Sequence, residues 1–378
     1  MAHMLLILSA VFLLLATHPF VTYPLSLYAI RRWHFRPLSL TADTAALRYA
    51  LCVCAYNEED CIAQKVENML ALRQVFPDLE ILVYVDAATD QTAAILKQYE
   101  NRIHVHYSPE RQGKAHGMNI LVSRAQANIV IFTDANVMFD TESFAHLPRY
   151  FADPQVGCVC GHLTYVNGGT TATATNGALY WRLEEHIKQL ESDTGSLVCA
   201  DGSVYAVRRQ LYQTIPDNCA DDMFVSMSIL CENYRVVRAS DILAYEESVT
   251  SAGEEFNRKI RIACMAFNTH RTLWPRLRNL GNLDLYKYVS HKLLRWFVIF
   301  WLALAVVSLI AGMSAAGGAE LILFGCAALA LGGIFRLLPI IQLIDILRAF
   351  TGTGIGVLRS LRGSHFRTWT PAASIRGK

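Results

Sequence analysis

The stretch IVIFTDANVMFD, residues 129–140, carries an apolar run directly into an aspartate. The residues from Ile129 to Thr133 have the composition of a buried strand. Asp134 follows at once, and Asn136 stands where a second acid would be expected. A hydrophobic core does not require an acid at the end of a strand. The stretch therefore predicts a strand that delivers Asp134 to a ligand.

Short apolar runs alternate with helical patterns over the region before this stretch. The strand-like runs are YALCVCAYN, EILVYVDAATD and IHVHYSP, at residues 49–57, 80–90 and 103–109. Helical patterns fill the intervals between the strand-like runs, at residues 58–72, 92–99 and 113–125. This alternation predicts an α/β domain with a mainly parallel sheet. Because such sheets bind ligands beyond the carboxyl ends of their strands, the polar loops after these strands should be neighbours.

Composition excludes some classes of protein. The chain has 378 residues, of which 53% are hydrophobic. Its net charge is only +2, so the chain lacks the strong positive potential that nucleic-acid binding requires. We expect the ten cysteines to be reduced thiols of a cytoplasmic domain. The pairs Cys52 with Cys54 and Cys158 with Cys160 are spaced by two, which puts each pair on one face of a strand and does not indicate a zinc site.

Three apolar segments are long enough to cross a bilayer. Residues 4–30 contain no Lys, Arg, Asp or Glu and run into RRWHFR, which favours a retained anchor over a cleaved signal peptide. Two more spans are expected at residues 293–313 and about 321–343. Lysines and arginines flank the spans on the side of the middle of the chain, so the positive-inside rule places residues 31–290 in the cytoplasm.

The tail sequence IDILRAFTGTGIGVLRSLRG, residues 344–363, is either a fourth span or a helix in the membrane interface. Its charged residues favour the interface. The expected organisation is therefore an anchor, a cytoplasmic domain, two transmembrane helices, and an interfacial helix with a basic tail, at residues 1–30, 31–290, 291–343 and 344–378.

Seven motifs follow one another along the chain, namely CAYNEED, VDAATDQT, RQGKAHGMN, FTDAN, ADGSVYAVRR, ADDMFV and NRKIRIACMA. In this order, between an N-terminal anchor and C-terminal spans, the chain resembles the membrane-anchored members of glycosyltransferase family 2. The resemblance implies a GT-A fold, in which a Rossmann-like domain binds a nucleotide sugar, and an enzyme that transfers the sugar with inversion.

The resemblance implies donor-binding roles around the base, ribose and diphosphate for Ala55, Asn57, Glu58, Glu59, Asp86, Lys114, Arg258 and Arg261. Asp86 would accept a hydrogen bond from a base N–H, with a simple turn role as the alternative. Lys114 would bind the diphosphate as a point cation, with a solvated surface lysine as the alternative.

The motif at Asp134 would hold a divalent cation. A hard cation bound by carboxylate oxygen neutralises the charge that grows on a diphosphate leaving group. The family's motif is DxD, whereas this chain has Asp134 and Asn136. Asparagine keeps an oxygen ligand and loses the charge. We therefore expect Mg²⁺ or Mn²⁺, held by Asp134, Asn136 and the substrate phosphates.

Asp221 and Asp222 match the family's acidic pair, whose second member is the general base. Asp222 would take the proton from an acceptor hydroxyl as its oxygen attacks the anomeric carbon. Asp221 would orient the acceptor or cap the helix that follows. Asp201 and Gly202 would line the acceptor entrance, with an ordinary turn as the alternative.

A membrane lipid that receives one sugar is the expected acceptor. Processive synthases of the family carry QxxRW, whereas residues 258–262 read RKIRI, without the glutamine and the tryptophan. Three transmembrane helices are also too few to enclose a polysaccharide channel. The amphipathic pattern at residues 177–192 fits an interfacial helix that approaches the lipid, with a core helix as the alternative.

We therefore expect a multi-pass enzyme of a bacterial inner membrane that transfers one sugar from a UDP-sugar to a polyprenyl-diphosphate-linked glycan, for exopolysaccharide assembly. The alternatives are a processive polysaccharide synthase, a ceramide or diacylglycerol glycosyltransferase, and a non-catalytic membrane protein that binds a nucleotide sugar. Retention of a base at Asp222 weighs against the last of these, because a sensor needs no base aimed at an acceptor.

Overall fold

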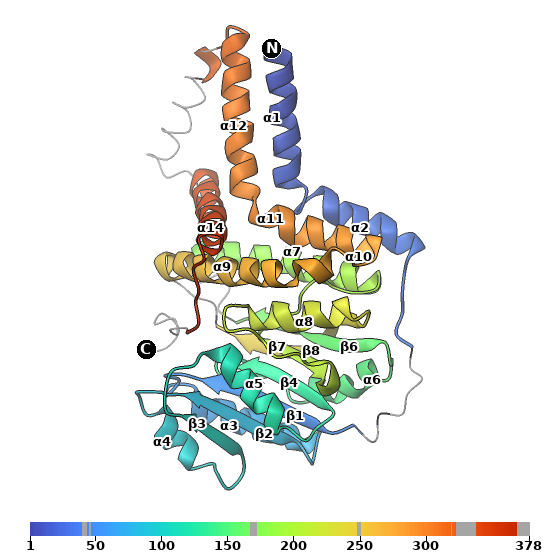
Figure 1. Cartoon of the computed structure of the whole chain (residues 1–378), viewed down its shortest axis with the longest axis vertical. Helices are drawn as coiled ribbons and strands as arrows, with labels where there is room; N and C mark the ends of the chain where they lie inside the picture. The colour runs from blue at the N-terminus through green and yellow to red at the C-terminus, as the bar shows by residue number, and fades with distance from the viewer. Residues whose placement is uncertain are drawn as a thin grey trace.

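The computed structural model describes residues 1–39, 44, 47–166, 172–247, 251–318, 320–322 and 338–368. Figure 1 shows an α/β unit at one end of the molecule and a layer of helices across it. From the other side of that layer two helices project side by side, α1 (Ala2–Thr17) and α12 (Val298–Ala315).

One sheet contains the eight strands of the described residues, in the order β3-β2-β1-β4-β7-β6-β8-β5. Their bounds are β1 (Tyr49–Ala55), β2 (Glu80–Asp86), β3 (His104–Ser108), β4 (Ile129–Asp134), β5 (Met138–Phe139), β6 (Val156–Tyr165), β7 (Val204–Arg208) and β8 (Arg235–Glu246). The half formed by β3, β2, β1 and β4 is parallel, as the sequence predicts. The other half is mixed, because β7 enters antiparallel to both β4 and β6, and β5 is antiparallel to β8. The prediction of a mainly parallel sheet is therefore confirmed only for the half formed by β3, β2, β1 and β4.

The parallel half brings its polar loops to one edge. In the strand register Cys54 lies beside Asp134. The loops after β1 and β2 are joined by hydrogen bonds from Thr89 N to Asn57 Oδ1, at 2.9 Å, and from Gln91 N to Glu59 Oε2, at 2.8 Å. The loops that follow these strands are thus neighbours.

Helices cover both faces of the sheet. One face packs against α3 (Ile62–Ala71), α4 (Thr92–Lys97) and α6 (Leu147–Phe151), and the other against α5 (Lys114–Arg124) and α8 (Asp221–Cys231). Cys52 and Cys54 lie in the same core cluster, on the α5 face, as their spacing predicts. The nine cysteines of the described residues are free thiols.

Helix α7 (Ala172–Asp193) lies in the helix layer with α9 (Ala252–Leu277) and α2 (Thr22–Trp33) (Figure 1). Ile187 and Leu190 of α7 are buried against Tyr23 and Leu27 of α2. The hydroxyl of Tyr23 also donates to the buried carboxylate of Glu191, at 2.5 Å. Because α2 covers this apolar face, this part of α7 is a core helix, and the interfacial interpretation of residues 177–192 is wrong for it.

The expected N-terminal span is bent. Helix α1 ends at Thr17, and α2 begins at Thr22 at an angle of 62° to it. Pro19 and Pro24 have no backbone N–H to donate, which interrupts the helical hydrogen bonding between the two helices. By length and composition one described helix, α12, could cross a membrane, and the number is two if the bent pair is one span.

The C-terminal segments agree with the expected spans only in part. Short helices precede α12, namely α10 (Asn282–Tyr288), a π-helical turn (Val289–Leu293) and α11 (Leu294–Trp296). The expected span at about 321–343 falls largely on residues outside those described. The predicted tail helix forms as α14 (Leu338–Leu361), and it packs on α9, where Ser360 Oγ donates to Asn268 Oδ1 at 2.6 Å.

Arg235 ties the segment before the sheet to the sheet itself. Its side chain is 5% exposed and pairs with Asp153 Oδ2 at 3.1 Å. It also donates to the carbonyl oxygens of Arg36, Pro37 and Gly195. The buried guanidinium therefore holds four groups that are distant in sequence.

Replacing Arg235 by Met should lower the free energy of unfolding by about 3–5 kcal/mol, because Asp153 would be left buried without its cation. Urea unfolding of the full chain, followed by tryptophan fluorescence, measures this loss. Arg102→Met is the control: Arg102 pairs with Glu67 at 3.5 Å with both side chains about half exposed, and its loss should cost under about 1 kcal/mol. Equal losses in the two variants would contradict the structural role of Arg235.

Candidate active site

A cleft of about 840 Å³ opens at the carboxyl edge of the parallel half of the sheet. It is lined by the ends of β4 and β8, the first turns of α5 and α8, one side of α9, and residues 366–368 of the tail. Its charged residues are Glu58, Lys114, Asp134, Asp201, Asp217, Asp221, Asp222, Glu246, Glu254, Arg258, Arg261, Arg359 and Arg367. A cleft lined in this way suits a charged, polar ligand.

Lys114 joins two acids that come from different segments. Its Nζ lies 2.8 Å from Asp134 Oδ1 and 3.0 Å from Asp221 Oδ2. Burial lowers the pKa of Lys114 and the two carboxylates raise it, with a net shift upward, so the side chain stays an ammonium. The end of β4 and the start of α8 therefore meet around a cation.

Helix α3 holds the turn that carries Asp134 and Asn136. Lys65 is fully buried, and its Nζ donates to Thr133 Oγ1 at 3.2 Å and to the carbonyl of Val137. The strand pairing of β5 with β8 continues directly from this turn. The two motif residues are thus fixed on both sides by a buried side chain and a strand.

Asp222 lies in the first turn of α8, one residue after Asp221. Its Oδ1 accepts from the backbone N–H of Met223 at 2.7 Å. Its Oδ2 would lie 3.2 Å from a Cβ placed on Gly202, so the backbone of Gly202 comes close to this carboxylate. Burial, and then the charge of Asp221, raises the pKa of Asp222 to about 7. A carboxylate with this pKa can act as a general base near neutral pH.

Arg258 and Arg261 line the cleft from α9. Arg258 lies 3.6 Å from Glu255 Oε2 and hydrogen-bonds Tyr165. The side chain of Arg261 makes no hydrogen bond or ion pair within the part of the chain that the structure describes. Burial, together with the charge of Arg258, lowers the pKa of Arg261. A cation held in this way favours an anionic ligand.

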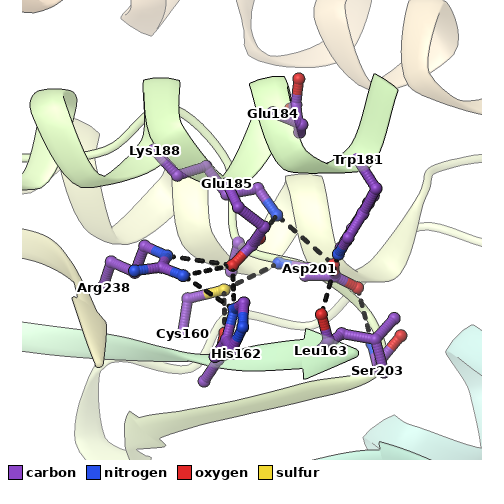
Figure 2. A network of polar contacts seen from close by, with 12 residues as sticks. Cys160, His162, Leu163, Trp181, Glu184, Glu185, Lys188, Asp201, Ser203 and Arg238 are labelled. Carbon is purple, nitrogen blue, oxygen red and sulfur yellow. Dashed lines mark hydrogen bonds and ion pairs between the residues drawn. The ribbon is translucent and has the colours of Figure 1, made fainter. Parts of the chain in front are cut away.

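Asp201 is fixed at the cleft wall by a polar network that Figure 2 shows beneath α7. Lys188 Nζ lies 3.4 Å from Asp201 Oδ2 and 3.0 Å from Glu185 Oε1. Glu185 Oε2 in turn pairs with Arg238 at 2.5 Å (Figure 2). Asp201 Oδ1 also accepts from Ser203 N at 3.0 Å, which closes a turn. The expected turn is present, and a buried ion-pair network orients its carboxylate as well.

Four residues at the end of β1 and in the loop after it were expected to bind the nucleotide-sugar donor, and they lie in different places. Glu58 lines the cleft. Asn57 and Glu59 bond the loop after β2 instead, and Ala55 is a buried strand residue. The structure therefore brings one of these four residues to the lining of the cleft.

Asp86 is completely buried and does not line the cleft. Its carboxylate accepts from the backbone N–H groups of Gln112, at 2.7 Å, and Gly113, at 3.1 Å, and lies 3.4 Å from Arg111 Nε. Both oxygens are occupied by the loop before α5. The structure thus shows contacts of the turn kind for Asp86, and a hydrogen bond to Asp86 from a base stays a prediction.

The C-terminal tail enters the cleft, which the sequence did not predict. Arg367 Nε lies 3.1 Å from Asp217 Oδ2 and donates to the carbonyl of Gln112 at 3.2 Å. Gly113 has a φ of +88°, and a Cβ there would lie 2.0 Å from Arg367 O, so the loop passes the tail only without a side chain. No motif indicated this contact, because the tail and the loop are about 250 residues apart.

The residues around Asp134 fit a divalent cation that also uses substrate oxygens. Asp134 is 38% exposed, and both Asp134 and Asn136, each of which has a side-chain oxygen, line the cleft. Within the described residues no group of three or more His, Cys, Asp or Glu side chains is arranged to hold a metal by itself. Mg²⁺ commonly binds through one or two carboxylates plus substrate phosphates, so this donor set fits a cation that binds together with a diphosphate.

The fold and the cleft define an α/β protein with a binding site for an anionic ligand at the carboxyl ends of its parallel strands. Residues 50–215 match the family model described as "Glycosyl transferase family 2". The chain therefore contains a glycosyltransferase family 2 domain, and the predicted enzyme class is confirmed at the level of this domain.

Two curated relatives are similar over part of their length. A poly-beta-1,6-N-acetyl-D-glucosamine synthase of Staphylococcus aureus is 25% identical over 191 residues, 49% of this chain and 46% of that protein. A beta-monoglucosyldiacylglycerol synthase of Synechocystis sp. is 23% identical over 270 residues, 67% of this chain and 56% of that protein. The chain thus spans about half the length of these relatives.

A solved structure shares the fold over nearly the whole chain. The mannosyltransferase PcManGT from Pyrobaculum calidifontis, in complex with GDP-Man and Mn²⁺, matches with a TM-score of 0.71 at 23% identity. The match covers 95% of this chain and 100% of that chain. This likeness shows the GT-A α/β fold.

Proposed function

We propose that this protein is an inverting glycosyltransferase that moves one sugar from a nucleotide-diphosphate sugar to a membrane lipid-linked acceptor. The observation that carries the proposal is that Asp134, Asp222 and Arg261 meet in one cleft, from β4, α8 and α9. The three side chains offer an acid for a cation, a base for the acceptor and a cation for the diphosphate.

Three cations of this chain would bind the donor diphosphate. Arg261 offers an unpaired fork of N–H donors, and Arg258 lies beside it on α9. Lys114 would exchange part of its contact with Asp134 for a phosphate oxygen. Mg²⁺ or Mn²⁺, held by Asp134 and Asn136, would act as a Lewis acid on the leaving diphosphate. The Mn²⁺ in the PcManGT complex supports this part of the proposal.

Asp222 would act on the acceptor. Its carboxylate takes the proton of the acceptor hydroxyl while that oxygen attacks the anomeric carbon, and the sugar–phosphate bond breaks on the opposite face, which inverts the configuration. Gly202 leaves room for the acceptor beside Asp222 Oδ2. Asp201, oriented by Lys188, would accept a hydrogen bond from a second acceptor hydroxyl. Asp221 keeps Lys114 near the donor.

The acceptor is proposed to be lipid-linked, with a polyprenyl-diphosphate glycan first. Helix α12 is apolar enough to cross a membrane, and it projects from the helix layer on the side away from the sheet (Figure 1). Helix α9 of that layer lines the cleft. The name of the Synechocystis relative favours diacylglycerol as a second candidate. The name of the Staphylococcus relative favours a processive synthase. Residues 258–262 lack the tryptophan of the QxxRW motif, which argues against processive synthesis. The protein would lie in a bacterial inner membrane with its domain in the cytoplasm.

A nucleotide-release screen tests the proposal. UDP-sugars and GDP-sugars are each incubated with the full chain and bacterial lipid extract, and released nucleotide and labelled lipid are measured together. We expect one donor, a UDP-sugar, to give release above the background of Asp222→Asn, and a lipid product with one added sugar. No donor above that background would contradict the proposal, and products with several added sugars would contradict single transfer.

A further inference from the structure

Helix α2 buries one apolar face and exposes a second one. Tyr23 and Leu27 are fully buried and pack against α7. Val21, Leu25 and Tyr28 follow one another at intervals of four and three, so they share the opposite side of the helix, and they are 48% to 62% exposed. The outward side of a helix in water is normally polar. This outer face of α2 (Val21, Leu25 and Tyr28) therefore indicates a surface that water does not cover.

Polar contacts tie α2 to the helix layer along its length. The hydroxyl of Tyr28 is hydrogen-bonded to His186 Nε2 of α7 at 2.5 Å. Arg31 Nε lies 2.7 Å from Asp193 Oδ2 at the end of α7. These contacts fix α2 at an angle of 62° to α1. Helix α2 thus lies on the layer and does not continue α1 as a straight span.

The bend places α2 on the side of the layer that α1 and α12 leave. Figure 1 shows α2 on the side of the helix layer from which these two helices project. Ser9 Oγ of α1 donates to Ala305 O of α12 at 2.9 Å, so the two apolar helices leave the layer together. A bilayer that both helices enter would have its surface along α2.

The charge of this segment suits anionic headgroups. Residues 1–42 contain no Asp or Glu. Arg32 and Arg36 are exposed, and their side chains form no ion pair with any residue that the structure describes. Trp33 between them is 81% exposed, and tryptophan is enriched at the membrane–water interface. Basic residues beside a membrane span attract anionic lipids. The apolar outer face and the two arginines together match the surface of an anionic leaflet.

We propose that the outer face of α2, with Arg32, Trp33 and Arg36, is a docking surface for the headgroups of anionic phospholipids. The inference rests on the proposed membrane location and goes beyond sugar transfer. Docking would set the height of the cleft above the lipid, because α2 packs on α7, and Lys188 of α7 holds Asp201 at the cleft wall.

The test reconstitutes the full-length protein in nanodiscs of phosphatidylcholine mixed with phosphatidylglycerol. The photo-crosslinking residue benzoylphenylalanine replaces one exposed residue at a time, and mass spectrometry identifies the adducts. Leu25 reports on the outer face of α2, Val307 of α12 reports on the bilayer, and Lys97 of α4 is the negative control. We expect lipid adducts at Leu25 and Val307 and none at Lys97. Phosphatidylglycerol should form about threefold more of the Leu25 adducts than its share of the bilayer.

R32Q/R36Q separates the charges from the apolar face. We expect this variant to keep lipid adducts at Leu25 and to lose the enrichment of phosphatidylglycerol in them. R102Q is the matched control, because Arg102 is a half-exposed arginine before β3, and it should keep the enrichment. Thermal unfolding checks that both variants fold.

Lipid adducts at Val307 without lipid adducts at Leu25 would overturn the inference, and so would adducts of Leu25 with a second protein molecule instead of lipid. An enrichment that is absent, or that R32Q/R36Q keeps, would overturn the assignment to anionic headgroups. Absence of lipid adducts at both Leu25 and Val307 would overturn the inference together with the membrane location. Sugar transfer is decided separately by the nucleotide-release screen, so these failures are distinguishable.

Discussion

Replacing Asp222 by Asn should lower sugar transfer by about 10²–10⁴-fold and leave donor affinity within about threefold, because an amide cannot take the proton of the acceptor. The carboxylate lies beside Gly202, and its Oδ1 accepts a hydrogen bond from Met223 N. Turnover with the donor found in the screen, and calorimetric titration of the same nucleotide, measure the two quantities separately.

The pH dependence of the natural chain supplies a second readout. Burial and the charge of Asp221 raise the pKa of Asp222 to about 7, while Lys114 opposes this shift. A general base must be deprotonated, so kcat/KM should fall as pH drops below about 7 and reach a plateau above it. The residual activity of Asp222→Asn should lack this inflection.

Asp217→Asn is the matched control for this pair of experiments. Asp217 lines the same cleft but pairs with Arg367 of the tail, at 3.1 Å, and is half exposed. We expect its transfer rate to stay within about threefold of the natural chain. If Asp222→Asn lost donor binding instead of transfer, the base would have to be another residue.

The parallel half of the sheet could be predicted from the sequence because each of its strands is an apolar run that ends in a polar loop. Ile129–Asp134 is the clearest case, with five buried residues before the acid. Most of the other half was not predicted. The strand around Cys158 and Cys160 was expected, whereas β8 carries charged residues such as Arg238, whose partners lie on α7, and β5 has only two residues. Such strands form through long-range pairing, which leaves no local pattern.

Candidate site residues could be predicted where a motif places a charge at the end of a strand or the start of a helix. Asp134, Asp222 and Lys114 all line the cleft. The resemblance to the family assigned Asp86 to the base, and no local pattern showed that the loop 26 residues later donates to both of its oxygens. Glu246 also lines the cleft and was not predicted, because only the pairing of β5 with β8 brings it to Asn136.

Replacing Asp134 by Ala should lower donor-dependent nucleotide release by about 10³-fold, which corresponds to about 4 kcal/mol of lost transition-state stabilisation. The change removes the one carboxylate of the motif and one of the two partners of Lys114. Mn²⁺ affinity should fall in parallel, because Asn136 alone is a neutral ligand.

Two further variants test whether the loss of nucleotide release in Asp134→Ala comes from the missing carboxylate. Asp140→Asn, in the same segment, caps the turn at Ser143 at 3.1 Å and should leave nucleotide release within about threefold. Asp134→Asn keeps an oxygen and removes the charge, so an activity between that of Asp134→Ala and that of the natural chain would assign part of the effect to charge. Near-normal turnover by Asp134→Ala would mean that Lys114, Arg258 and Arg261 neutralise the diphosphate without the motif, and the cation role of Asp134 would then be wrong.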